Sequence, residues 1–453
     1  MRHLFLCFML LFVPLCAEEN LVVRLPTQTE LLPLYLSQIT GQDTEFDKGY
    51  LSKLDAVLRY DFENNGITQV LERSSDKETL ASKSYDDPRK AFDQWRRAKA
   101  MYVVVPRVEA NHLNVRLISL NNEVVKEISD ITLSGNLNED RRRIHQTADS
   151  IHHELFGTEG IASTRILFTR RITNAKGTTD SEVWEADYDG NNARQVTNEG
   201  AYIVTPTYVP PATGKAPGQF MYVTYKWGQP KVMYASLKTG EGQRLSPLRG
   251  NQLLPAVSPQ RDRVAFISDI TGNPDLFVQG FNPDAGPIGK PHQVFAAQGA
   301  VQGSPSFSPN GTQLAFVSNK AGQPQIYVMN IPDPGARLSE LKPVVISTRA
   351  RNGSAPSWSP DGTKIAFTAL TQGLRQIWVY DFDTRQEYQI TTGPSHKENP
   401  SWAPDSLHLV YNTADQGSAD LYMIDLRRLK PIKIVAGDGE KRFPAWEPRP
   451  LQR

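Results

Sequence analysis

Between residues 200 and 450 the chain repeats one pattern of apolar and polar positions. Each copy opens with a proline, has an aromatic residue two positions later in most cases, and reaches a second proline after two more positions. A polar turn follows, as in Pro360-Asp361-Gly362, where Asp tolerates the bend and Gly supplies a positive φ. Short apolar runs such as Ile365-Ala366-Phe367 then predict further strands. The six opening prolines are Pro206, Pro255, Pro305, Pro356, Pro400 and Pro444.

Four short strands in a period of 44 to 51 residues are typical of a β-propeller blade. The alternative is a linear β-solenoid, whose repeats are usually shorter and whose ends need caps. The ends of the repeated region favour the propeller, because residues 443–448 supply a first strand that lacks the other three. Strands two, three and four of that unit are predicted at 165–169, 183–186 and 193–197. Joined, they make a sixth blade that closes the ring and removes exposed sheet edges.

The region before the repeats predicts a small α/β domain. Apolar residues at helical spacing alternate there with short runs rich in β-branched residues. Gly157 to Gly160 ends the last helix and marks the boundary. The predicted helices are 51–62, 87–98 and 140–155, and the predicted strands are 67–72, 101–105, 112–118 and 123–128. The predicted domains are an α/β domain at 18–158 and a six-bladed propeller at 159–448, with a tail at 449–453.

The first seventeen residues have the pattern of a cleaved secretory signal. A basic start precedes an apolar run from Leu4 to Leu15, and the small Ala17 stands before two acidic residues. The run is too short to span a membrane, and no later segment is apolar enough to do so. Lipidation at Cys16 is the alternative, which the bulky Pro14-Leu15 before it disfavours. We therefore expect an exported, soluble protein.

Composition removes several classes of function. Cys7 and Cys16 are the two cysteines and both lie in the predicted signal, so the mature chain has no disulfide. Loss of Arg2 with the signal leaves 49 basic and 49 acidic residues. This balance gives no electrostatic case for binding nucleic acid or an anionic membrane.

Motifs for catalysis or metal binding are weak. No Gly-x-Ser-x-Gly elbow is present, and Gly214-Lys215 lacks the glycine spacing of a phosphate loop. The segment 187–191 (Asp-Tyr-Asp-Gly-Asn) resembles a calcium loop, but it lacks the distal Glu and is predicted to be a hairpin turn.

Three histidines on the last predicted helix suggest a metal site, since His145 and His152 share a face. However, they and His153 lack a carboxylate partner beyond Glu154, and they flank the apolar stripe as partly exposed residues do. We predict no catalytic residue, no cofactor and no metal ligand.

The loops that lead into the six first strands emerge on one face of the ring, around the mouth of the channel. We call it the channel-mouth face. Its mixture of charges and amides suits a polar protein partner. The candidate contact residues in these loops are Tyr202, Arg249, Asn251, Gln252, Gln302, Arg351, Asn352, His396, Lys397, Glu398, Lys441 and Arg442.

Three segments resemble the TolB family. They are the repeat segments 359–367 (SPDGTKIAF) and 325–330 (QIYVMN), and the ending 443–446 (FPAW). The segment from Ile144 to Ile166, which joins the last predicted helix to the propeller, is also similar to TolB. The resemblance spans nearly the whole mature chain.

The resemblance implies a non-enzymatic periplasmic scaffold of the Tol–Pal system, which supports outer-membrane integrity and cell division. TolB proteins bind the peptidoglycan-associated lipoprotein Pal on the channel-mouth face, and their extended N-terminus engages TolA in the inner membrane. We therefore expect a monomer with a Pal-like partner and a TolA-like partner. By position, the implied Pal-contacting loops contain Arg249, Asn251 and Gln252, and Gln302, Gly303 and Ser304. The implied tail for the TolA-like partner is Glu18, Glu19, Asn20, Leu21, Val22 and Val23.

The sequence departs from the family at three places. The first loop lacks the usual histidine, and the second lacks the usual Glu-Pro pair. A longer, Pro-rich insertion at 210–219 replaces the usual Ser-Pro-Asp-Gly turn.

Two other classes of function stay open. A metal-dependent propeller hydrolase needs acidic and amide side chains that converge in the channel, where the first strands offer mostly Ser, Thr and aromatic residues. A glycan-binding propeller of the envelope needs aromatic residues exposed on a face. Trp358, Trp402 and Trp446 lie within predicted strands and are expected in the core.

Overall fold

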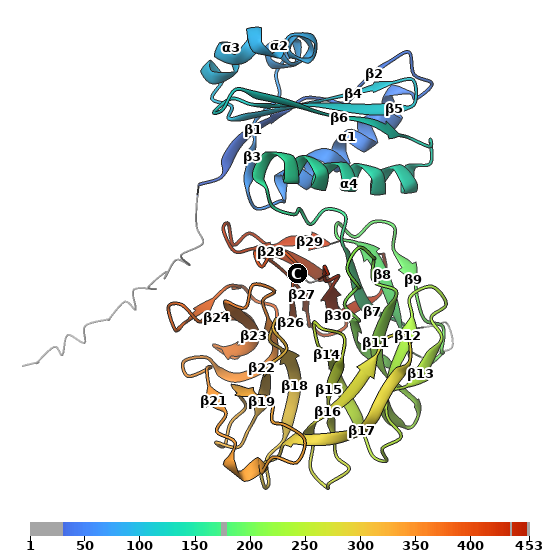
Figure 1. Ribbon diagram of the computed structural model, residues 1–453, viewed down its shortest axis with the longest axis vertical. Helices are drawn as coiled ribbons and strands as arrows, with labels where there is room; N and C mark the ends of the chain where they lie inside the picture. Colours follow the sequence, from blue (N-terminus) through green and yellow to red (C-terminus); the bar gives the residue numbers. More distant parts are fainter. Residues whose placement is uncertain (1–29, 174–178, 435–436, 451–453) are drawn as a thin grey trace, which may run out of the picture.

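The computed structural model describes residues 30–173, 179–434 and 437–450, and it has two domains (Figure 1). The predicted signal at 1–17 and the predicted partner tail at 18–23 lie outside these residues. No helix in the described ranges is long and apolar enough to cross a membrane.

The N-terminal domain is a sheet with helices on both faces. Its strand order is β3-β1-β4-β5-β6, with β2 paired to β4. Successive residues of β4 point to opposite faces, so Val104 packs with α1 and α4 whereas Val103 and Val105 pack with α2 and α3. The elements are β1 (Leu32–Leu36), β2 (Thr40–Gln42), α1 (Lys48–Glu63), β3 (Thr68–Val70), α2 (Ser75–Asp86), η1 (Pro88–Ala91), α3 (Phe92–Arg97), β4 (Tyr102–Glu109), β5 (His112–Ser119), β6 (Val124–Thr132) and α4 (Leu137–Phe156).

Most of the predicted elements of this domain are confirmed, with two differences. The helix predicted at 87–98 is the short η1 followed by α3, and α2, β1 and β2 were not predicted. Asp87, which precedes Pro88, has a non-helical backbone (φ −135°, ψ 80°), so the chain bends there. Helix α2 buries only Ala81, Ser84 and Tyr85, which is too narrow an apolar stripe to stand out in the sequence.

The propeller has six sheets of four antiparallel strands. Five sheets follow chain order, and the sixth has the order β30-β7-β8-β9. The six blades predicted from the repeats are therefore confirmed. The innermost strands are β10 (Ile203–Tyr208), β14 (Gln252–Val257), β18 (Gln302–Phe307), β22 (Arg351–Trp358), β26 (Lys397–Trp402) and β30 (Glu440–Trp446). The second strands are β11 (Gln219–Trp227), β15 (Arg263–Ser268), β19 (Gln313–Ser318), β23 (Lys364–Thr371), β27 (His408–Thr413) and β7 (Arg165–Thr173).

The outer two strands of each blade are more variable in length. The third strands are β12 (Gln229–Ser236), β16 (Asp275–Asn282), β20 (Gln325–Asn330), β24 (Leu374–Asp381), β28 (Leu421–Asp425) and β8 (Thr179–Asp187). The fourth strands are β13 (Gly242–Arg244), β17 (Gly286–Phe295), β21 (Val344–Val345), β25 (Gln386–Gln389), β29 (Ile432–Ile434) and β9 (Arg194–Gln195), and the short η2 (Leu338–Glu340) precedes β21.

The last strand closes the ring, as predicted. Trp446 of β30 pairs with Ile166 of β7, although 280 positions separate them in the chain. Trp446 is 4% exposed, and its indole Nε1 donates a hydrogen bond to Oγ1 of Thr164 at 2.8 Å. The C-terminal strand is thereby fixed to the segment that follows the N-terminal domain.

A bulge recurs in all six innermost strands. The residue before each opening proline has a φ between 44° and 55°, although none is glycine. The register with the second strand shifts at the same place in every blade. A bulge re-aims a strand and frees one residue from the ladder, which makes this left-handed conformation tolerable. The six residues are Thr205, Leu254, Ser304, Ala355, Asn399 and Phe443.

The two domains share one apolar core. Leu54 and Ile151 of the N-terminal helices belong to the same cluster as Val410, Met423 and Trp446 of the propeller. Figure 1 shows the N-terminal domain against the edge of the ring, beside β28 and β29 and beside β8. The domains are therefore packed together rather than joined only by a linker.

The predicted exposure of the α4 histidines is wrong for two of the three. His145 and His152 are 1% and 5% exposed, because this helix packs between the sheet and the propeller. His153 is exposed, with its imidazole Nδ1 3.3 Å from a Glu159 carboxylate oxygen. The predicted hairpin turn at 187–191 is confirmed, since the Gly190 N–H donates to the Asp187 carbonyl at 2.8 Å.

Candidate partner-binding face

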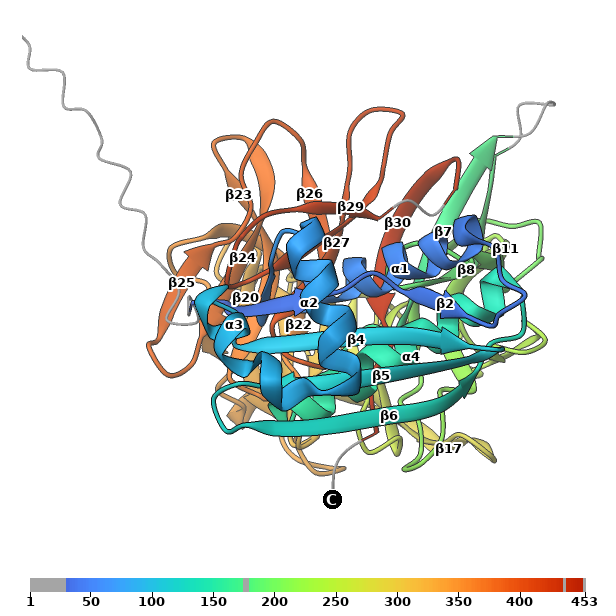
Figure 2. The same cartoon turned by 90° about the horizontal axis from the view of Figure 1, so that it is seen from above.

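The channel-mouth face carries the loops before the innermost strands together with the hairpins between second and third strands. Antiparallel order places both sets at the same end of every blade. In Figure 2 the end of β7 and the hairpins near β23 and β26 point to one side of the molecule. The opposite face carries the turns after the second prolines.

The predicted contact residues differ in exposure. Those that are exposed are Tyr202, Arg249, Arg351 and Asn352. Those that are half-buried are Asn251, Gly303, Ser304, His396, Glu398 and Arg442. Those that are buried are Gln252, Gln302, Lys397 and Lys441. Each lies at the start of an innermost strand or in the loop before it, so all are brought to one face.

The buried members of this set hold the loops in place. The Gln252 amide nitrogen donates to the Leu248 carbonyl at 2.9 Å, and the Lys441 ammonium lies 3.1 Å from Asp420. The Lys397 ammonium donates to the Ser395 carbonyl at 2.7 Å, and burial lowers its pKa. We infer that these buried side chains fix the conformation of the loops that form the face.

The half-buried residues are also held by neighbours. The amide of Asn251 donates to a carboxylate oxygen of Asp269 at 2.7 Å. Glu398 forms an ion pair with Arg375, and the Arg375 backbone N–H donates to His396 Nδ1 at 3.1 Å. The loops therefore present a preorganised set of polar groups around the channel mouth.

Exposed apolar side chains lie on the same face, and apart from Tyr202 sequence reasoning missed them. Of nine large apolar residues exposed in the described chain, six lie at this end of the blades. A single apolar residue beside a strand end looks like an ordinary strand residue in the sequence, so no pattern marked the other five. They are Ile172 (45% exposed), Tyr202 (44%), Trp227 (55%), Ile270 (40%), Val301 (50%) and Leu370 (39%).

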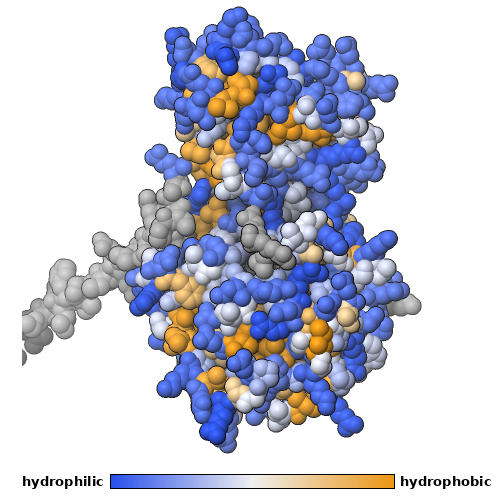
Figure 3. All heavy atoms as spheres, in the orientation of Figure 1, coloured by the Kyte–Doolittle hydropathy of each residue, from blue (hydrophilic) through white to orange (hydrophobic). Residues whose placement is uncertain are grey.

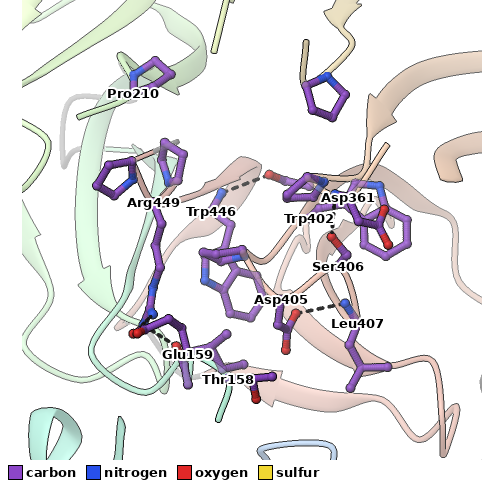
Figure 4. A pocket seen from close by; sticks show the side chains of 18 of the residues that line it. Thr158, Glu159, Pro210, Asp361, Trp402, Asp405, Ser406, Leu407, Trp446 and Arg449 are labelled. Carbon is purple, nitrogen blue, oxygen red and sulfur yellow. Dashed lines mark hydrogen bonds and ion pairs between the residues drawn. The ribbon is translucent and has the colours of Figure 1, made fainter. Parts of the chain in front are cut away.

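The opposite face contains a cavity of about 940 Å³ between the ring and the linker that leaves α4. Trp402 and Trp446 line it, and Asp405 and Arg449 point toward partners at its wall (Figure 4). The second proline of every repeat also lines it: Pro210, Pro259, Pro309, Pro360, Pro404 and Pro448.

The charged groups of this cavity are already engaged. A carboxylate oxygen of Asp405 lies 2.6 Å from His408 Nδ1, and Arg449 pairs with Glu159 at 2.6 Å. Both tryptophans donate their indole N–H to protein acceptors. Trp402 and Trp446 are 5% and 4% exposed, so the prediction that they lie in the core is confirmed. Trp358 is only half-buried.

A second groove, of about 450 Å³, follows the seam between the domains. Leu31, Val70 and Ile432 line it, and apolar surface shows along this seam in Figure 3. The described chain begins beside it, at Glu30.

Among the described residues, no group of three or more His, Cys, Asp or Glu side chains close enough to share a metal ion lies in the channel. In the described part of the chain, one group of three such side chains is close enough to share a metal ion: His145, Asp187 and Asp189. These residues lie at the domain interface.

Comparison with known proteins places the chain in a family. The family model "TolB beta propeller domain" matches residues 152–450. A protein TolB homolog of Protochlamydia amoebophila is 49% identical over 400 residues, which cover 87% of this chain and 85% of that protein. A protein TolB homolog of Chlamydia pneumoniae is 37% identical over 398 residues, with coverage of 87% and 85%.

A solved structure agrees with the fold. The crystal structure of TolB from Acinetobacter baumannii superposes with a TM-score of 0.72 at 19% identity, and the match covers 93% of this chain and 98% of that one. Both domains are included in this coverage. The chain belongs to the TolB family.

Proposed function

We propose that this protein is a non-enzymatic scaffold of the Tol–Pal system in the periplasm, which binds a Pal-like peptidoglycan-associated lipoprotein through the channel-mouth face. Membership of the TolB family supports the system. The observation that carries the choice of face is the gathering of six exposed apolar side chains around loops rich in amides and charges.

Such a surface has the anatomy of a protein interface. Six of the nine large apolar side chains exposed in the described residues share this face with polar loops, and a mixture of apolar and polar groups is what a protein partner covers. Val301 directly precedes Gln302, and Ile270 follows Asp269, whose carboxylate holds Asn251. The apolar side chains thus flank the two loops implied by the family resemblance.

Two matched pairs of variants test this face. The soluble domain of the Pal-like lipoprotein from the same organism is titrated into the mature chain, and the dissociation constant is measured by calorimetry. Ile270→Ser and Val301→Ser should each weaken binding about ten-fold or more, because each removes apolar contact from the interface. The controls Ile288→Ser and Val344→Ser change residues that are 54% and 64% exposed in fourth strands, and should leave binding unchanged.

A charge test complements the apolar one. Reversal of Arg249 and Arg351 to Glu should also weaken binding, most strongly at low salt. If the Arg variants and both Ser variants bind the lipoprotein with unchanged affinity, the channel-mouth face is not the binding site. Absence of any binding by the folded wild-type chain would refute the Pal-like partner.

The predicted tail at 18–23 is proposed to engage a TolA-like protein. Its removal should abolish binding of the soluble TolA-like domain and leave the affinity for the lipoprotein intact. If the truncated chain bound neither the TolA-like domain nor the lipoprotein, the tail and the channel-mouth face would not be separate sites.

A glycan-binding function has one observation in its favour. Trp227 and Tyr202 are exposed on the channel-mouth face, and the Tyr202 ring lies 5.5 Å from that of Tyr225. Saturable binding of soluble peptidoglycan fragments, lost in Trp227→Ala, would establish that role. Turnover on a hydrolase panel would refute a non-enzymatic scaffold.

A further inference from the structure

Metal-ligating side chains from the two domains meet at their interface. His145 comes from α4, and Asp187 and Asp189 come from the end of β8 and the turn after it. One ligand atom of each lies within 4.8 Å of the others. We propose that these three residues form a binding site for a divalent transition-metal ion of the Zn²⁺ type, which ties the N-terminal domain to the closing blade.

The turn fixes both carboxylates. The Asp187 N–H donates to the Asn191 carbonyl at 2.9 Å, which closes the turn, and the Asn191 N–H donates to Asp189 Oδ1 at 3.0 Å. The Asp187 side chain accepts from the Asn192 amide at 2.6 Å. These bonds fix the two carboxylates at the turn, where they face α4.

The orientation of His145 is the observation that points to an ion. Its Nδ1 lies 2.9 Å from both oxygens of Asp61, and this contact directs Nε2 away from Asp61 toward the two aspartates of the turn. The residue is 1% exposed, and Nε2 has no hydrogen-bond partner among the described residues. It faces Asp189 Oδ2 at 3.6 Å.

This arrangement is the one that metal-binding histidines adopt. A carboxylate behind the imidazole fixes the tautomer and raises the basicity of the ligating nitrogen. Asp61 is itself held by the Tyr188 hydroxyl, which donates at 2.7 Å, and the Tyr188 ring packs edge-on against His145. An ion would also satisfy the buried Nε2, whose isolation is otherwise unfavourable.

The charges and donor atoms select the class of ion. Two carboxylates balance a divalent charge, and imidazole with carboxylate suits Zn²⁺ better than Ca²⁺, which takes six to eight oxygens. Arg141 donates to Asp189 Oδ2, and the Arg142 and Arg165 guanidinium groups lie 3.7 and 3.9 Å from Asp187 Oδ1. Asp189 Oδ2 also accepts from the Asn191 side-chain amide at 3.0 Å, whereas Asp189 Oδ1 accepts one backbone N–H. The hydrogen bond to Asp187 goes to Oδ2, so one oxygen of each carboxylate keeps a lone pair for an ion.

The test uses the full mature chain, stripped with a chelator and dialysed. Calorimetric titration with ZnCl₂ should show one ion per chain, and saturation should raise the melting temperature by a few degrees. Hydrogen exchange should slow in α4 and in the 187–191 turn. Co²⁺ should bind competitively and give the visible absorption of a four-coordinate site.

Variants assign the site. His145→Gln and Asp189→Asn should bind Zn²⁺ more than ten-fold more weakly, and Asp61→Asn about 10- to 100-fold more weakly because it removes the carboxylate behind the imidazole. His152→Gln is the matched control, since His152 is buried on the same helix but pairs with Thr158 at 3.0 Å. It should bind as the wild type does.

Two results would overturn the proposal. One is the absence of stoichiometric Zn²⁺ binding by the folded wild-type chain. The other is an unchanged affinity for Zn²⁺ in Asp189→Asn. This variant keeps the volume of the side chain, so it can be measured even if His145→Gln does not fold. The proposal is independent of partner binding on the channel-mouth face, and neither result bears on that function.

Discussion

Replacement of Trp446 tests how the ring is sealed. The side chain is 4% exposed in the cluster that joins both domains, and it donates a hydrogen bond to Thr164 at 2.8 Å. Removal of a buried tryptophan costs about 3–5 kcal/mol through lost apolar burial and the cavity left behind. Because the strand that carries it closes the blade β30-β7-β8-β9, this loss should reach both domains.

Urea unfolding followed by tryptophan fluorescence and hydrogen exchange gives the measurement. Trp446→Ala should lower the free energy of unfolding by about 3–5 kcal/mol and raise exchange in β7 and in α4 together. Trp446→Phe should lose about 1–2 kcal/mol, because the ring stays but the hydrogen bond to Thr164 does not.

Trp402→Ala is the matched control. Trp402 is 5% exposed and also donates its indole N–H, to the Ser357 carbonyl at 2.9 Å, but it lies in a core cluster formed by propeller residues alone. It should destabilise the propeller without raising exchange in α4. A loss below about 1 kcal/mol for Trp446→Ala, or exchange confined to residues 440–450, would contradict the closure.

Three further predictions concern the domain seam and the closing strand. Burial raises the pKa of the Glu447 carboxyl from 4.5 to about 7. Between pH 4.5 and about pH 7 the folded chain therefore binds one more proton than the unfolded chain, and its free energy of unfolding falls as the pH rises through this range. Glu447→Gln should therefore match the wild type near pH 4 and exceed its free energy of unfolding by up to about 3 kcal/mol at pH 8, measured in urea; equal stability at both pH values would contradict this burial. Gly66→Ala places a Cβ 2.6 Å from Leu407 at a φ of 70°, whereas Gly200→Ala, at a φ of 60°, meets nothing within 4 Å. The melting temperature should fall further for Gly66→Ala, by the equivalent of about 1–3 kcal/mol, and an equal fall would mean that the domains do not pack at Gly66. Truncation after Gly437 should abolish cooperative unfolding of the propeller, because it exposes the edge of β7; an unchanged transition would refute the ring.

The propeller was predictable because its information is local and repeated. The six copies of the repeat that opens with a proline predicted six blades. The incomplete copy at 443–448 predicted that the last strand closes the ring. Helix α2 was not predictable by the same reasoning, since its buried face is only Ala81, Ser84 and Tyr85. The recurrent bulge was also hidden, because the residues before the opening prolines share no side-chain type.

The candidate sites depend on contacts that no periodicity encodes. His145 was expected to be partly exposed, since its helix carries a clear apolar stripe beside it; the propeller then covers that side as well. The turn at 187–191 meets α4 across some 40 residues of intervening chain, so its carboxylates and the imidazole could not be joined from spacing alone. Gln252 and Gln302 were chosen for their polar character, yet tertiary packing buries them both.

The channel-mouth face is the central claim, and a hydrogen-exchange footprint of the bound lipoprotein tests it most directly. The account predicts slower exchange in the loops at 249–252 and 301–304 and in the hairpin that carries Ile270, with no change around the opposite cavity. Protection at 402–407 and in the linker after α4, with the channel-mouth loops unaffected, would contradict it.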